Sequence, residues 1–235
     1  MRAIIDLDTA IYASCFNVET LGEAKEKLEE KLDSILSHLS DFCEVNEVWI
    51  CNGSRNNFRK AVNKSYKANR TQELPQFLGE LHDWVKTTFN SYWTDGYETD
   101  DVVATLWKQS VEELGKDNVV IVSADKDFKQ FPCLFFDSYW NRMELTKIGE
   151  FEAKYNFYTQ MIVGDSADNV NYIKGKGKRY ATKLFSDAES EFTLLRRTYE
   201  EFMNVYGDDA KDKFNECKKL LKLDTDVKQI KSLQA

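Results

Sequence analysis

The fold class is decided by the stretch Val119-Val120-Ile121-Val122-Ser123-Ala124-Asp125-Lys126-Asp127. Its four consecutive apolar residues are typical of a strand that is buried on both faces of a parallel sheet. Two acids, Asp125 and Asp127, follow this strand directly. A helix that follows a strand needs only one capping acid, so the pair favours a functional site at the end of the strand.

Apolar segments on either side of this stretch alternate with helical patterns. Apolar residues recur at helical spacing over 22–43 and over 100–114. Three more segments have the pattern of strands, and they cover 3–5, 45–51 and 134–136. This alternation predicts an α/β fold with a mostly parallel sheet that is wrapped by helices.

The second part of the chain has a different pattern. After about residue 145 it predicts helices alone, and its last dozen residues have no regular pattern. We therefore expect a core over 1–145, which includes a basic segment at 54–74, and a helical region over 146–235. Glycines interrupt this helical region at Gly164, Gly175, Gly177 and Gly207.

Composition limits the class of protein. The chain has 235 residues, with 32 Lys plus Arg and 40 Asp plus Glu, so its formal net charge is −8. That balance argues against a simple nucleic-acid coat, which needs an excess of positive charge. No apolar run reaches the roughly 18 residues that span a bilayer, and early acids argue against a secretion signal. Five cysteines without a CxxC pair argue against zinc clusters and disulfides, so a cytoplasmic setting is expected.

Acidic residues gather in four clusters, each at the end of a predicted element. Two clusters follow strands, and sites in open parallel sheets form outside the carboxyl ends of the strands. So many carboxylates in one pocket repel one another unless cations neutralise them. Two Mg²⁺ or Mn²⁺ ions would do so, but acids at helix starts are also common caps, and the pattern leaves both interpretations open. The nine acids are Asp6, Asp8, Glu98, Asp100, Asp101, Asp125, Asp127, Asp165 and Asp168.

Six cations occupy residues 54–70 without an acid, and two aromatic residues, Phe58 and Tyr66, lie among them. Such a mixture can hold phosphates and stack on bases. The alternative is a solvated loop, because like charges disfavour a packed core. The six cations are Arg55, Arg59, Lys60, Lys64, Lys67 and Arg70.

A second basic signal surrounds Gly175 and Gly177. Two glycines one residue apart allow a tight turn, and the helix expected near Arg179 offers free N–H groups to a phosphate. The turn lacks both common nucleotide-binding patterns, G-x-x-x-x-G-K-[ST] and GxGxxG. Its four cations are Lys174, Lys176, Lys178 and Arg179.

Taken in chain order, these motifs resemble the 5′→3′ exonuclease/flap endonuclease family, which is found in bacteriophages and as the N-terminal nuclease of bacterial DNA polymerase I. The resemblance covers about residues 1–186. The similar segments are Ile4-Ile5-Asp6, Asn57-Phe58-Arg59, Tyr66-Lys67-Ala68-Asn69-Arg70, Gly96-Tyr97-Glu98-Thr99-Asp100-Asp101-Val102, Ser123-Ala124-Asp125-Lys126-Asp127, Gly164-Asp165-Ser166-Ala167-Asp168-Asn169 and Ala181-Thr182-Lys183-Leu184.

The resemblance implies a PIN-like nuclease core, an arch over the active site at 54–74, and a helix–three-turn–helix element at about 160–186. It implies hydrolysis of phosphodiester bonds with two Mg²⁺ ions at 5′ ends and branched junctions of DNA, and in RNA–DNA hybrids. Primer removal or DNA degradation in phage replication would be the setting, in a bacterial cytoplasm. The protein would be a monomer, and single-strand-binding or replication proteins could assist it.

The resemblance also implies roles for individual residues. The acids, apart from Asp8, match the family's metal-site positions, and Asp125 and Asp165 would be essential for catalysis. Lys67 and Arg70 match arch residues that contact the scissile phosphate, with Tyr66 beside them. Gly175 and Gly177, with the cations around them and those of the arch, would bind the nucleic-acid backbone, and the hairpin could also hold K⁺.

Two positions depart from the family pattern. Asn52 stands where the family usually has an acid at the end of the second strand, and we hypothesise that Asp8 replaces the missing charge. Rival interpretations are a PIN-type ribonuclease for single-stranded RNA, a structure-specific DNA-binding protein with a weakened metal site, and a structural α/β protein with acidic caps. The glycine hairpin argues against the first, and the ordered motifs argue against the last.

Overall fold

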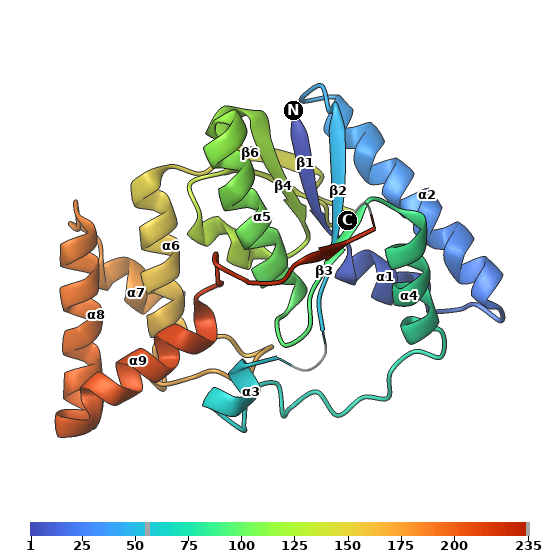
Figure 1. Ribbon diagram of the computed structural model, residues 1–235. Helices are drawn as coiled ribbons and strands as arrows, with labels where there is room; N and C mark the ends of the chain where they lie inside the picture. Colours follow the sequence, from blue (N-terminus) through green and yellow to red (C-terminus); the bar gives the residue numbers. More distant parts are fainter. Residues whose placement is uncertain (55–56, 234–235) are drawn as a thin grey trace.

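A computed structural model describes residues 1–54 and 57–233 of the chain (Figure 1). The nucleic-acid contact expected at Arg55 lies outside the described residues. Seven strands form one sheet in the order β6-β5-β4-β1-β2-β3-β7. The five inner strands are parallel, whereas β6 and β7 pair antiparallel to β5 and β3 at the two edges. The strands are β1 (Arg2–Asp6), β2 (Glu47–Asn52), β3 (Ser91–Trp93), β4 (Val119–Ser123), β5 (Leu134–Asp137), β6 (Glu144–Lys147) and β7 (Lys231–Ser232).

The deciding stretch forms the centre of the sheet as predicted. All five residues of β4 are buried, and their side chains alternate between the two faces. Val120 and Val122 pack in one apolar core, while Val119 and Ile121 pack in the other. Period-2 alternation into two cores is what a strand covered on both faces requires. The α/β class with a mostly parallel sheet is confirmed.

Helices cover both faces of this sheet. The first core is closed by α1 (Asp8–Ser14), α2 (Leu21–Ser40) and α4 (Leu78–Thr88). Figure 1 shows α5 and α6 on the other side of the sheet from these helices. Apolar residues of α5 (Thr99–Leu114) and α6 (Glu150–Val163) pack in the second core, together with the short helix η2 (Lys126–Gln130). A further short helix, η1 (Lys116–Asn118), leads into β4.

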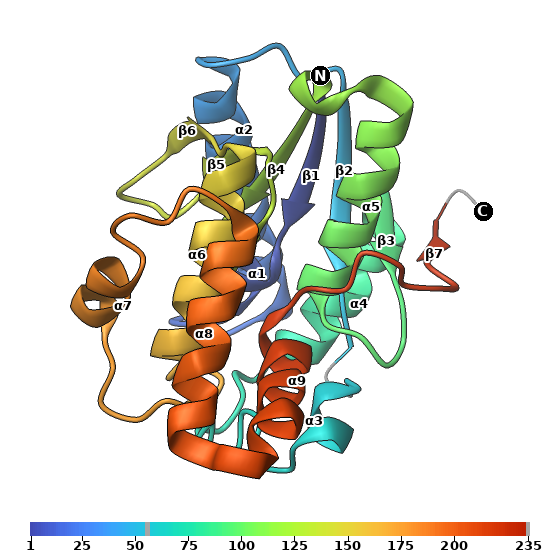
Figure 2. The same cartoon turned by 90° about the vertical axis from the view of Figure 1, so that its left-hand side faces the viewer.

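A third apolar core lies outside the sheet. It joins α6 to α7 (Lys178–Leu184), α8 (Glu191–Tyr206) and α9 (Ala210–Leu221), with η3 (Gly207–Asp209) linking the last two. Figure 2 shows α7 and α9 on opposite sides of α8. Tyr66, from the basic segment, also packs in this core, so the segment is fastened to the helical part. The short helix α3 (Arg59–Val62) begins the basic segment.

The expectation that strands end near residue 145 is wrong at one place. The chain returns from α9 to the sheet, where β7 pairs with β3. A two-residue edge strand is set by tertiary pairing, so no local pattern announces it. Within residues 1–54 and 57–233, no helix has the length and apolarity needed to cross a membrane.

Candidate active-site cleft

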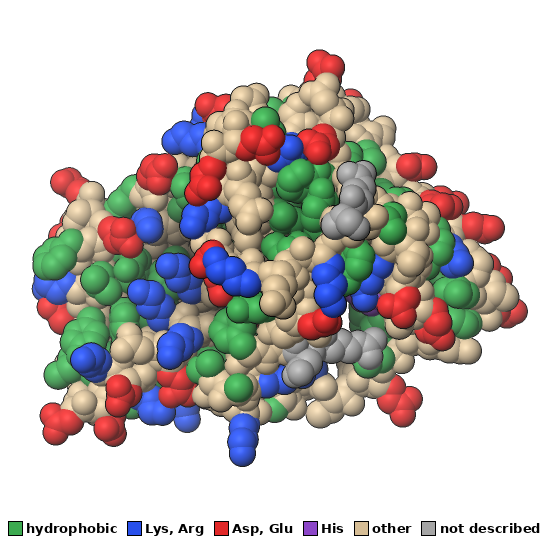
Figure 3. All heavy atoms as spheres, viewed as in Figure 1, with side chains coloured by type: hydrophobic (Ala, Val, Ile, Leu, Met, Phe, Trp, Pro, Cys, Tyr) green, Lys and Arg blue, Asp and Glu red, His purple; other side chains and the backbone are tan. Residues whose placement is uncertain are grey.

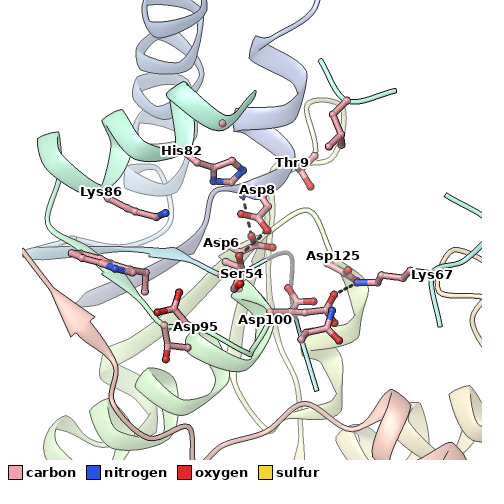
Figure 4. A pocket seen from close by; sticks show the side chains of 18 of the residues that line it. Asp6, Asp8, Thr9, Ser54, Lys67, His82, Lys86, Asp95, Asp100 and Asp125 are labelled. Carbon is pink, nitrogen blue, oxygen red and sulfur yellow. Dashed lines mark hydrogen bonds and ion pairs between the residues drawn. The ribbon is translucent and has the colours of Figure 1, made fainter. Parts of the chain in front are cut away.

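Parallel strands bring their carboxyl ends to one edge of the sheet, and several of the predicted acids meet there. Asp6 ends β1, Asp8 begins α1, Asp100 lies in the first turn of α5, and Asp125 comes two residues after β4. Figure 4 shows these carboxylates around one cleft, with Lys67 approaching from the arch and His82 and Lys86 from α4. The cleft has a volume of about 700 Å³, and Glu98, Arg70 and Trp93 also line it.

Asp6 and Asp8 are held by short hydrogen bonds. Asp6 accepts from the Ser123 hydroxyl at 2.7 Å and from the Asp8 backbone N–H at 3.1 Å. The Thr99 hydroxyl donates to Oδ2 of Asp8 at 2.7 Å. Oδ1 of Asp8 is buried and has no hydrogen-bond partner among the described residues. A buried carboxylate oxygen without a partner is costly, and a cation bound at Asp8 would remove this cost.

Three acids of the cleft hold protons more tightly than isolated carboxyls. Burial, and after it repulsion from Asp8, raises the pKa of Asp6 to about 7. Burial and the charge of Asp6 raise the pKa of Asp100 well above its ordinary value. Burial also raises the pKa of Asp125. A site that disfavours its own negative charge in this way attracts cations.

Three side chains, those of Lys67, Tyr66 and Arg59, contact the Glu98 carboxylate. Lys67 forms an ion pair with its carboxylate, and the Tyr66 hydroxyl donates to it at 2.8 Å. The same Tyr66 hydroxyl lies 2.7 Å from Asp168, so its one proton is shared between the two carboxylates, and Arg70 pairs with Asp168 at 2.9 Å. Burial raises the pKa of Glu98, but Lys67 and then Arg59 outweigh it and lower the pKa overall. The arch cations therefore neutralise acids at the rim of the cleft.

The remaining acids form a second group beside the cleft. Gln160 donates to Asp127 at 2.8 Å, and Lys126 lies 3.5 Å from Asp165. Burial and the charge of Asp125 raise the pKa of Asp127 to about 7. Asp165 accepts from the backbone N–H groups of residues 167 and 168, so it also caps the turn after α6. Asp125 interacts with both groups and connects them.

The structure corrects the prediction for Asp101 and Arg59. The guanidinium of Arg59 forms a bidentate pair with the Asp101 carboxylate at 2.6 and 2.7 Å. Arg59 is 1% exposed and Asp101 is 0% exposed. Neither side chain can meet a metal in the cleft or a phosphate at the surface, because both are buried and engaged in hydrogen bonds inside the protein. Asp101 also completes the capping box of α5 with Glu98.

Tyr66 is also displaced from its predicted role. Its side chain is 3% exposed and packs in the third core, so its ring cannot stack on a base. Lys67 and Arg70 do line the cleft, whereas Lys64 is exposed on the arch. The arch is tied to the loop after α6, because the Lys67 N–H donates to the Asp168 carbonyl at 2.9 Å.

A turn that contains Gly175 and Gly177 lies directly before α7. Gly175 has φ +77°, a left-handed conformation that favours glycine, and Gly177 directly precedes α7. Lys174, Lys178 and Arg179 are exposed around it. Lys176 lies 3.8 Å from the centre of the Tyr180 ring.

Three residues that line the cleft escape sequence reasoning. His82 and Lys86 lie four residues apart on α4, and Trp93 ends β3. His82 contacts Oδ1 of Asn52 through Nδ1 at 3.1 Å, and Asn52 is fully buried. The i,i+4 spacing placed both side chains on one helix face, but only the packing of α4 turns that face toward the cleft.

Side-chain positions alone do not form a closed metal site. Over the described ranges, no group of three His, Cys, Asp or Glu side chains could hold a metal ion as it stands. Several predicted ligands are instead engaged by cations, as Glu98 is by Lys67 and Asp101 is by Arg59. The donor chemistry of the cleft nevertheless fits a hard divalent cation, since its floor is made of carboxylate oxygens with a free one at Asp8.

Solved structures share this fold. The D15 protein of T5, co-crystallised with metal ions, superposes with a TM-score of 0.61 at 15% identity, covering 94% of this chain and 100% of that one. The catalytic core of Rad2 in complex with DNA substrate gives a TM-score of 0.54 at 12% identity, covering 96% of this chain and 81% of that one. The fold is therefore the PIN-like α/β fold of these nucleases.

The family follows from sequence comparison. A family model described as the 5′-3′ exonuclease, N-terminal resolvase-like domain matches residues 3–156, and the chain belongs to this family. It is 35% identical over 161 residues to DNA polymerase I of Rhizobium leguminosarum, covering 63% of this chain and 15% of that protein. It is 27% identical over 183 residues to the flap endonuclease Xni of Shewanella frigidimarina, covering 73% of this chain and 67% of that protein. The chain thus spans less than a fifth of the length of the DNA polymerase I relatives it matches.

Proposed function

We propose that this protein is a divalent-metal-dependent 5′→3′ exonuclease and flap endonuclease that hydrolyses phosphodiester bonds of duplex or branched DNA. RNA–DNA hybrids are included as substrates, with primer removal or DNA degradation in phage replication as the setting. The observation that carries the proposal is one cleft that combines buried carboxylates with two cations of the arch, Lys67 and Arg70.

The carboxylates would hold the metal ions. Asp6, Asp8, Asp100 and Asp125 form the floor of the cleft, and Asp127, Asp165 and Asp168 extend the acids beyond Asp125. Mg²⁺ or Mn²⁺ bound there would activate a water and neutralise the charge of the scissile phosphate. Glu98 would join the four acids of the floor as a metal ligand once Lys67 turns away from it toward a phosphate. Asp101 is left out because it pairs with Arg59.

The arch would bind and orient the substrate. Lys67 is 16% exposed and Arg70 is 57% exposed in their side chains, and both pair with Asp168. A phosphate in the cleft offers these cations a stronger partner, and their charge would stabilise the negative charge that develops on it. The buried Tyr66 hydroxyl orients Glu98 and Asp168 through its bond to each.

The glycine hairpin would hold the duplex away from the cleft. Its exposed cations and the N–H groups at the start of α7 suit a phosphate backbone, and K⁺ could bind at the turn. This assigns 146–235 as a helical region for duplex binding, beside a nuclease core over 1–145. We further propose a monomer in a bacterial cytoplasm, assisted by single-strand-binding or replication proteins.

Digestion of 5′-labelled DNA tests this function. Duplex, flap and RNA–DNA substrates are incubated with Mg²⁺ or with EDTA, and single-stranded RNA serves as the comparison. We expect release of 5′ products from duplex and flap substrates with Mg²⁺ and none with EDTA. Cleavage of single-stranded RNA alone would favour a PIN-type ribonuclease, and tight flap binding without cleavage would favour a DNA-binding protein with a weakened metal site.

A further inference from the structure

The chain beyond the matched family region returns to the active-site side of the molecule. Residues 220–233, which we name the C-terminal strap, leave α9, cross α5 and reach β3 at the edge of the sheet (Figures 1 and 2). The family model ends at residue 156, so it assigns nothing to the strap. Some of the strap's contacts reach the segment that carries Glu98, at Thr94 and at Asp101.

The first anchor of the strap is the buried pair of Arg59 and Asp101. Arg59 donates to the backbone carbonyl of Leu220 at 3.0 Å and to that of Lys222 at 3.1 Å. The backbone N–H of Asp224 donates to Asp101 at 2.8 Å. The strap thereby makes three of the hydrogen bonds that this pair needs beyond its own, and a buried ion pair is stable only when its remaining hydrogen bonds are made.

The second anchor is the hydroxyl of Thr105 on α5. It accepts from the Val227 N–H at 3.1 Å and donates to the Asp224 carbonyl at 3.3 Å. Thr105 is 1% exposed, so this hydroxyl has no water to bond in place of the strap. The end of the strap then pairs as β7 with β3, where Lys231 lies opposite Trp93.

The first anchor and the last part of the strap both reach the wall of the cleft. Arg59 donates to Glu98 at 3.2 Å, while it holds the strap with its other nitrogens. Thr94 of the cleft wall donates to the strap carbonyl of Gln229 at 3.4 Å. The strap therefore contacts the segment 93–101 near both of its ends.

We propose that the C-terminal strap positions the cleft wall and the Glu98 carboxylate for metal binding, with Arg59 as the positioning residue that transmits its hold. The proposal rests on the function proposed above, because Glu98 acts there as a metal-site acid. Side chains that orient metal ligands typically change metal affinity by roughly 10–100-fold when they are removed.

The test compares Thr105→Val with Thr105→Ser. Valine removes the hydroxyl that binds the strap, whereas serine keeps it, and neither residue contacts the cleft. Mn²⁺ binding to the protein without DNA is measured by electron paramagnetic resonance. We expect a dissociation constant raised roughly tenfold in the valine variant and unchanged in the serine variant. Duplex binding in EDTA should stay the same in both.

A second pair of variants changes a residue of the strap itself. Asp224→Pro removes the backbone N–H that donates a hydrogen bond to Asp101, whereas Asp224→Asn keeps this N–H. The proline variant should lose Mn²⁺ affinity as the valine variant does. Wild-type Mn²⁺ affinity in correctly folded Thr105→Val and Asp224→Pro proteins would overturn the proposal.

Hydrogen exchange tests the same coupling in the unaltered protein. If the strap strengthens metal binding, bound Mn²⁺ must stabilise the strap by the same factor. The amides of Asp224 and Val227 should therefore exchange more slowly with Mn²⁺ than without it, and equal rates would overturn the proposal. A wild-type protein that binds Mn²⁺ but cleaves no flap contradicts the proposed function instead, and the two failures are thus distinguishable.

Discussion

Asp8 and Asn52 differ in how the fold uses them. Asn52 is fully buried and contacts His82 through Oδ1, and its Nδ2 has no partner in the described part of the chain. Asp8 has a free buried oxygen at the cleft. These contacts favour Asp8 as the residue that supplies the charge missing at Asn52.

Replacing Asp8 by Asn tests this assignment. The variant keeps an oxygen for the Thr99 hydroxyl but loses a negative charge, so metal binding should weaken. We expect the Mg²⁺ concentration for half-maximal cleavage to rise roughly tenfold. Asp83→Asn is the matched control, because Asp83 also lines the cleft but its side chain is 79% exposed. Equal Mg²⁺ dependence in the two variants would remove the role given to Asp8.

Lys67 makes a separate prediction at the residue scale. It has φ +54°, and its ammonium group lies between Glu98 and Asp168 at the rim of the cleft. Lys67→Ala should lower the rate of single-turnover cleavage by about 10²-fold or more, as the loss of one preorganised electrostatic contact does elsewhere. Lys67→Arg retains the charge and should recover part of the rate. An alanine variant that cleaves at the wild-type rate would place the scissile phosphate elsewhere.

At the scale of elements, the turn after α6 depends on a single glycine. A Cβ at Gly164 would lie 2.2 Å from the Val170 carbonyl oxygen, and Gly164 has φ +77°. The turn also carries Asp165 and Asp168, so its closure places both acids. The sequence alone indicates that a helix ends here. Only the tertiary structure brings the backbones of Gly164 and Val170 close together.

Gly164→Ala should therefore lower the free energy of unfolding by about 2 kcal/mol or more, measured by urea denaturation. Gly79→Ala provides the contrast, since a Cβ at Gly79 meets nothing within 4 Å. Gly79 lies in α4, where alanine is the better helix former, so that variant should gain up to about 1 kcal/mol. A Gly164 variant as stable as wild type would mean that the turn relaxes without cost.

The stability of the whole molecule depends on the protons that two buried acids, Asp6 and Asp127, bind. Burial raises the pKa of Asp6 and of Asp127 to about 7, whereas both titrate near their ordinary value of 3.8 when the chain unfolds. Between these values the folded state binds more protons than the unfolded state. Stability contributed by these acids therefore falls as pH rises through that window.

The melting temperature of the metal-free protein should thus decrease between about pH 4 and about pH 7. Mg²⁺ should raise it more at the higher pH, because the metal binds the ionised carboxylates. Asp6→Asn should flatten the pH dependence, which separates the cleft from other titrating groups. A metal-free melting temperature that rises over this range would contradict the assignment of these protons.

At the scale of the whole molecule, the cations are distributed differently from what the sequence indicates. The sequence concentrates cations in the basic segment and the glycine hairpin. Figure 3 shows Lys and Arg side chains that also gather over α6 and α9, interspersed with acids. A net charge of −8 therefore says little about where a polyanion can bind, because cations and acids are unevenly distributed over the molecule.

The sequence by itself determined four inner strands of the sheet, β1, β2, β4 and β5, the main helices on its two faces and the acids at its carboxyl edge. Those features follow from local patterns, since β4 is apolar throughout, α2 and α5 have helical periodicity, and parallel strands end at one edge. The glycine hairpin was also predictable, because φ +77° at Gly175 suits the residue found there.

Only the tertiary structure decided which charged residues reach the cleft and which neutralise one another. Arg59 and Asp101 belong to motifs that looked exposed, yet they form a buried pair with the strap. Tyr66 packs in a core and Lys67, next to it, faces the cleft. His82 and the strap join the site through contacts between residues far apart in the chain. Sequence patterns record periodicity within an element, whereas burial and ion pairing depend on which elements meet in space.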